Sequence, residues 1–252
     1  MIIAILVLFF TVTLSGFLVK VFPPDSIKWL KMALAFSGAY LFTITIIHLL
    51  PDVLLAESSN PHMVGYWVLA GFFLQLVLEI FSHGVEHGHM HTSKHSHGHV
   101  GSMPFLLLGS LFIHSFLEGS ILVDGNSRHI GHHHEGGNFY VVLLGIAIHH
   151  VPAAFALMSV LLFRIGNFRK AFLWLLIFAA GAPLGIIVSN LVLSGQVGSG
   201  LVYTALTGLV AGNFLHISTT ILFETSPEHH FNRNKLIATL IGLGLALATD
   251  FI

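Results

Sequence analysis

Long apolar runs alternate with short polar segments along almost the whole chain. A run of roughly 17–25 mostly apolar residues is long enough to cross the hydrocarbon core of a bilayer as a helix. Because a single chain in lipid must satisfy its own backbone hydrogen bonds, such runs are predicted to be helical. The pattern therefore predicts an all-α membrane protein with eight transmembrane helices, at about 2–22, 29–50, 64–83, 103–123, 139–163, 171–193, 200–223 and 235–252.

The composition agrees with this interpretation and narrows the chemistry. Of 252 residues, 55% are hydrophobic and 8% are charged, and the mean hydropathy is +0.87, far from the usual composition of a soluble domain. We predict one transmembrane domain over residues 1–252, with 2–22 as a retained span because no basic segment precedes it. A net charge of -1 provides no basic surplus for nucleic acid. Without cysteine, a metal would bind imidazole, carboxylate or carbonyl groups.

The distribution of basic residues predicts how the chain is oriented. Lysine and arginine are retained on the cytoplasmic side of a membrane. The connectors after the first, third, fifth and seventh spans hold most of these residues, and the other connectors hold only Arg128. Both termini are therefore predicted to lie outside. The basic residues on the predicted inner side are Lys20, Lys28, Lys31, Lys94, Arg164, Arg169, Lys170, Arg233 and Lys235.

Two connectors are rich in histidine. The loop 83–101 begins with 83-HGVEHGHMHTSKHSHGH-99 and is predicted to be cytoplasmic, whereas the shorter loop 124–138 contains 129-HIGHHHEGG-137 and is predicted to lie outside. Histidine-rich tracts of this kind are typical of segments that bind metal weakly. A solvated linker of low complexity is the alternative.

Polar side chains inside two consecutive spans indicate a metal site. His114 and Glu118 lie four residues apart in the fourth run, on one face of a helix. His149 and His150 lie near the middle of the fifth run, where Pro152 removes a backbone donor. Intramembrane ionisable groups are costly and usually mark a pathway or a site. Two imidazoles and a carboxylate at one depth suit a divalent cation, above all zinc.

Other polar positions are open to a functional or a structural interpretation. His216, Thr220 and Glu224 share one face of the seventh run and are predicted to line an exit route, although a packed histidine and an interfacial glutamate explain them equally well. At the outer end of the second run, His48 and Asp52 share a face and are candidates for an entrance or a helix cap. Glu79, near the inner end of the third run, adjoins the histidine-rich loop, and an interfacial charge is enough to explain it.

Several motifs together resemble the ZIP (Zrt/Irt-like) metal-ion transporters. They are the eight spans, the histidine-rich loop after the third span, and the segments 48-HLLPD-52, 114-HSFLEG-119, 149-HHVPAA-154 and 211-AGNFLHI-217. The similarity covers essentially the whole chain. It implies a ZIP-like helix bundle, a binuclear metal site between the fourth and fifth spans, uptake toward the cytoplasm, and movement of one helix group against another.

Carried over to this chain, the resemblance implies that His114, Glu118 and His149 are primary ligands. Ser115 and His150 stand where the family often has asparagine and an acid. The chain also departs from the family pattern. Ala153 replaces a ligating residue, Ala182 replaces an acid that some members use for the second metal, and Leu117 replaces a proline. These departures favour a single site, which either stays open or takes a further ligand, with His150 and His216 as the available substitutes.

The expected function is transport of divalent metal into the cytoplasm. The expected ion is Zn²⁺, with Fe²⁺, Mn²⁺ and Cd²⁺ left open, and no organic cofactor is expected. A non-transporting metal sensor or receptor is the alternative, and an intramembrane metallohydrolase is a weaker one, because the chain lacks an HExxH motif. The partners expected are divalent ions and the lipid bilayer of a plasma or bacterial inner membrane, and a homodimer is left open.

Overall fold

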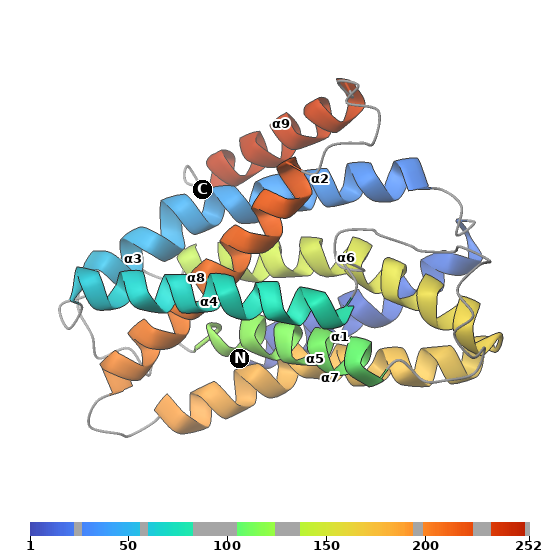
Figure 1. Cartoon of the computed structure of the whole chain (residues 1–252), viewed down its shortest axis with the longest axis horizontal. Coiled ribbons are helices and arrows are strands. Elements are labelled where there is room, and N and C mark those ends of the chain that lie inside the picture. Colours follow the sequence, from blue (N-terminus) through green and yellow to red (C-terminus); the bar gives the residue numbers. More distant parts are fainter. Residues whose placement is uncertain are drawn as a thin grey trace.

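The computed structural model describes residues 1–22, 27–55, 60–82, 105–123, 137–193, 199–223 and 233–249. In these ranges the chain is helical and contains no strand (Figure 1). The α-helices are α1 (Ile2–Phe17), α2 (Ile27–Ile44), α3 (Leu50–Leu55), α4 (Pro61–Ser82), α5 (Phe105–Ser120), α6 (Gly137–Ile165), α7 (Phe168–Leu193), α8 (Ser199–Phe223) and α9 (Arg233–Ala248). The prediction of an all-α membrane protein is confirmed.

Each apolar run of the sequence contains a helix, but the helices differ in length. Within the described residues, six helical segments are long and apolar enough to cross a membrane: Ile2–Lys20, Trp29–Leu55, Pro61–Ser82, Phe139–Ile165, Phe168–Leu193 and Gly200–Phe223. Helices α5 and α9 have 16 residues each in the described part of the chain. The count of eight spans and the outer position of both termini stay predictions. The loop 83–101, and the loop 124–138 up to the start of α6, lie outside the described residues.

The second span is one long helix with a local widening near its end. Helices α2 and α3 are joined by a π-helical turn over Thr45–Leu49. Pro51 lies two residues after this turn, and it has no N–H to donate to the carbonyl of Ile47 four residues earlier. A wider turn is a common response to such a missing hydrogen bond. It places His48 inside the protein, 8% exposed.

The helices pack in two groups. In the first group, α1 packs against α6 and α7, and α5 packs against α7. In the second group, α4 packs against α8, and α2 packs against α9 and α8. In Figure 1, α5 lies beside α7 on one side of the bundle, and α2 lies beside α9 on the opposite side. Helix α8 crosses between these two pairs. The two groups meet mainly where α2 contacts α6 and α4 contacts α5.

Helices α5 and α7 approach each other unusually closely, because glycine occurs at their crossing. A Cβ atom at Gly119 would lie 2.1 Å from the carbonyl oxygen of Ala182, and one at Gly185 would lie 2.0 Å from that of Phe116. Either side chain would therefore force the two backbones apart. Small residues permit this kind of close packing between membrane helices. The contact fixes α5, and with it the polar face of α5, against α7.

Candidate metal centre

Three side chains from α5 and α6 form a compact group of metal-binding atoms. His114 and Glu118 lie one turn apart on α5, and His149 lies in the middle of α6. One ligand atom from each of them lies within 4.8 Å of the other two. All three residues are buried, with exposed fractions of 2%, 0% and 0%. Two imidazoles and one carboxylate around one point are a donor set suited to zinc and related divalent ions.

His150 orients the carboxylate of this group. Its Nε2 lies 2.7 Å from Oε2 of Glu118, while Oε1 of Glu118 lies 3.3 Å from Nε2 of His114. One carboxylate oxygen is therefore held by His150 and the other faces the histidine ligands. Hydrogen bonds from a second layer of residues commonly fix the orientation of metal ligands in this way. The sequence predicted His150 as a ligand, whereas the structure places its Nε2 on Glu118.

Asn213 of α8, in the second helix group, approaches the three metal-binding side chains. Its Nδ2 lies 3.4 Å from Nδ1 of His114, and its side chain is fully buried. This contact connects α5 to α8 at the level of the candidate metal site. Asn213 was not singled out from the sequence, although it stands in the segment 211-AGNFLHI-217 as an amide within an apolar run. Its role depends on a partner 99 residues away, which spacing along the chain does not reveal.

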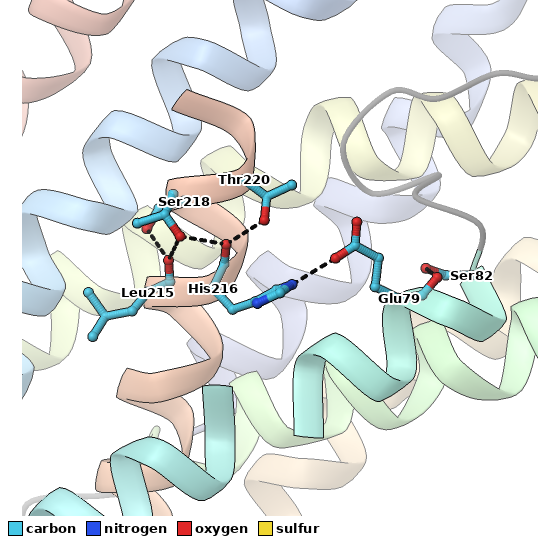
Figure 2. Close-up of polar contacts among 7 residues, drawn as sticks. Glu79, Ser82, Leu215, His216, Ser218 and Thr220 are labelled. Atoms are coloured by element: carbon cyan, nitrogen blue, oxygen red, sulfur yellow. Dashed lines mark hydrogen bonds and ion pairs between the residues drawn. The ribbon is translucent and has the colours of Figure 1, made fainter. Parts of the chain in front are cut away.

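His216 belongs to a second pair rather than to the group around His114. Its Nε2 lies 2.7 Å from Oε2 of Glu79 on α4, and its ring packs edge-on against Phe72. Figure 2 shows the imidazole of His216 reaching across from α8 to the carboxylate of Glu79. His216 is buried and Glu79 is 23% exposed. Thr220, one turn further along, donates to the carbonyl of His216, and Glu224 lies outside the described residues.

Ser115, the remaining predicted site residue, contacts the backbone of α7. Its hydroxyl oxygen accepts a hydrogen bond of 3.1 Å from the N–H of Ala182. Ala182 and Ala153 are both buried and offer no donor atom at the positions where the family resemblance implies ligands. The described residues thus provide one three-residue ligand group, and the assignment of Ser115, His150 and His216 as ligands stays a prediction.

A small hollow lies beyond the far end of this site. Its volume is about 30 Å³, and it is lined by residues of α3, α6 and α8 and of the segments that adjoin α3 and α5, among them Asp52, Leu122, Tyr203 and Thr207. Ile121 and Leu122, which line the hollow, directly follow α5, the helix that carries Glu118. Asp52 is exposed and Thr207 is buried. The oxygen atoms of these side chains give the hollow a polar lining that a hydrated cation favours.

The helical bundle and the buried His/Glu group together define a multi-pass integral membrane protein with a candidate site for divalent metal. Residues 1–104 and 100–250 match the family profile described as ZIP Zinc transporter. Because these matches cover nearly the whole chain, the protein belongs to the ZIP zinc transporter family. No curated protein matches the chain significantly. The family consists of divalent metal transporters, which agrees with the expectation that the chain is not an enzyme.

Proposed function

We propose that this protein moves Zn²⁺ into the cytoplasm, and that the ion binds in transit to His114, Glu118 and His149. The observation that carries the proposal is the convergence of these three buried ligands from two helices within 4.8 Å. A divalent cation between one carboxylate and two neutral imidazoles replaces its hydration with three protein ligands, which fits the preference of zinc for nitrogen and oxygen in a tetrahedral shell. The missing donor at Ala153 leaves room for water or for a moving ion.

A line of polar groups along α8 supports a route through the protein. Tyr203 and Thr207 line the hollow, Asn213 contacts His114, and His216 pairs with Glu79. We propose that metal enters through the hollow beside Asp52, binds at the three-ligand group, and leaves past His216 and Glu79. Each step then replaces one set of oxygen and nitrogen ligands with another, so the ion is not exposed to the apolar interior.

The division into two helix groups supports a mechanism of alternating access. The three ligands all belong to the group α1, α5, α6 and α7, while Asn213 and His216 belong to the other group. Where the groups meet, Gly145 of α6 faces the buried side chains of Tyr40 and Ile44 of α2, and the hydroxyl of Tyr40 donates to the carbonyl of Val141. A rigid shift of one group against the other would carry the bound ion from one side to the other, as in transporters with a site near the midplane.

Direction and topology complete the proposal. The distribution of basic residues supports an arrangement of eight spans in which the connectors after the first, third, fifth and seventh spans are cytoplasmic and both termini lie outside. The His216–Glu79 pair then lies on the cytoplasmic side of the site and the hollow lies on the outer side. A homodimer is compatible with this arrangement and stays a prediction.

Metal uptake by the purified protein in sealed proteoliposomes tests the function. We expect uptake of Zn²⁺ that depends on the protein, with Fe²⁺, Mn²⁺ and Cd²⁺ competing in proportion to their affinity for the site. A receptor that does not transport, the alternative favoured by the absent donor at Ala153, would bind zinc without accumulation. Efflux in the orientation with both termini outside would contradict the proposed direction.

A further inference from the structure

His114 has a partner at each of its two ring nitrogens. Its Nε2 faces Oε1 of Glu118 at 3.3 Å, and its Nδ1 faces the amide of Asn213 at 3.4 Å. A neutral imidazole carries one N–H and one lone pair. In the arrangement seen, Nδ1 accepts from Nδ2 of Asn213, so the proton of the neutral ring resides on Nε2, which lies at ion-pair distance from the carboxylate.

Metal binding at the three-ligand group requires the opposite tautomer. The nitrogen of His114 that faces Glu118 is Nε2, so the ion must take the lone pair of this atom and the proton must reside on Nδ1. Nδ1 then needs a hydrogen-bond acceptor in a fully buried position, because an unpaired buried N–H is costly. A proton leaves Nε2 and one is taken up at Nδ1, so the imidazole stays neutral and no net proton is exchanged.

Asn213 already carries the acceptor that this tautomer needs. Its Oδ1 is buried and has no hydrogen-bond partner among the described residues. A half-turn of the carboxamide about its last side-chain bond exchanges Oδ1 and Nδ2 without changing the shape of the side chain. The same residue can therefore donate to Nδ1 in the empty protein and accept from it in the loaded one.

We infer that Asn213 is a positioning residue for His114, whose carboxamide oxygen accepts the Nδ1–H of His114 when Nε2 binds the metal ion. This inference rests on the proposed function, and it gives α8 a role in metal binding. The metal ligands all lie on α5 and α6, but the tautomer of one of them is set from α8. Loading of the site therefore reverses the direction of a hydrogen bond between the two helix groups.

Zinc binding by the purified full-length protein, with Zn²⁺ alone as the probe, tests this role. Asn213→Leu keeps the approximate shape but removes both polar atoms, and the affinity for zinc should fall about 10- to 100-fold, as for other partners of metal-bound histidine. Asn213→Asp can only accept from Nδ1–H and should retain the affinity of the unmodified protein or exceed it. Asn190→Leu is the matched control, because Asn190 on α7 donates to the backbone carbonyls of Leu122 and Ile186 and should leave the affinity unchanged.

A spectroscopic measurement reports the tautomer directly. In protein labelled with ¹⁵N-histidine, the signals of His114 are identified as those missing from His114→Ala. On addition of zinc, the proton should be found on Nδ1. This measurement uses the unmodified ligand set, so it decides the question even if Asn213→Leu does not fold.

The outcomes separate this inference from the proposed function. Unchanged zinc affinity in Asn213→Leu, an equal loss in Asn213→Asp, or a proton on Nε2 in the zinc-loaded protein would each overturn the role of Asn213 while leaving the site intact. If His114→Ala itself binds zinc as well as the unmodified protein does, the proposed site is wrong and the inference is wrong with it.

Discussion

Glu118 contacts two histidines in the candidate site, His114 and His150. It is fully buried, it lies one turn from His114 on the same helix, and both of its oxygens face imidazoles. A carboxylate in this position offsets the charge of a divalent ion, and at the same time it is the acceptor for His150. Its two roles are separable because only the first of them requires a negative charge.

Glu118→Gln should abolish most transport with little loss of fold. Glutamine keeps the shape and can accept from His150 through its carbonyl oxygen, so we expect a change of less than about 2 kcal/mol in the free energy of unfolding. Loss of the charged ligand should lower zinc uptake by at least about ten-fold. Uptake in proteoliposomes and thermal unfolding of the same preparation provide the two readouts. Unchanged uptake combined with a large loss of stability would mean that the pair only locks helices together.

The position of Ala153 predicts that the site can be strengthened. Ala153 lies one helical turn after His149, on the same face of α6, and is 5% exposed. Ala153→His adds a donor beside the three ligands, so zinc affinity should rise by about ten-fold, equivalent to 1.4 kcal/mol, and release should slow. Ala153→Leu adds bulk without a donor and serves as the control. If both variants change affinity alike, volume and not ligation is responsible.

At the scale of helices, the site depends on how closely α5 and α7 pack. Gly119 belongs to the sequence motif that contains His114 and Glu118. The structure explains why this position is a glycine, because its backbone contacts Ala182 of α7 and leaves no space for a side chain. A methyl group at this crossing would move α5 and the two ligands that it carries. The ligand geometry and the helix contact are therefore coupled.

Gly185→Ala tests this coupling without touching a ligand. The added methyl group would lie 2.0 Å from the carbonyl oxygen of Phe116, and we expect a loss of about 1–3 kcal/mol of stability from overpacking, together with reduced uptake. Gly109→Ala is the control on α5, because a Cβ there has no neighbour within 4 Å. That variant should be neutral or slightly more stable, by up to about 1 kcal/mol. Equal unfolding temperatures for the two variants would refute the close approach.

The sequence predicts the helices and the ligands more fully than it predicts their partners. The helices follow from hydropathy alone, and His114 with Glu118 follows from a spacing of four residues on a helix. His149 follows from its central position in the next span. The contacts of Asn213 with His114 and of His216 with Glu79 join residues 99 and 137 positions apart. Such pairs depend on how α8 crosses the bundle, which no local periodicity encodes.

At the scale of the whole molecule, orientation in the membrane decides which end of the route is the entrance. The chain contains no cysteine, so single introduced thiols report one position each. Cysteines at Ser59 and Ser199 should react with an impermeant reagent applied to intact cells, and one at Ser93 should react only after permeabilisation. The reverse labelling pattern would invert the topology and the assigned direction of transport.

The bond between His150 and Glu118 has a consequence for which cations the protein rejects. Because His150 holds Oε2 at 2.7 Å, an ion entering the site finds one available oxygen of this carboxylate, beside two nitrogens. Calcium takes six to eight oxygen ligands and often both oxygens of a carboxylate, and magnesium requires an octahedral shell of oxygens. Neither hard cation gains enough at this site to shed its water. Zinc uptake should therefore persist in a large excess of calcium or magnesium, and His150→Ala, which releases the second oxygen, should make the same transport sensitive to both.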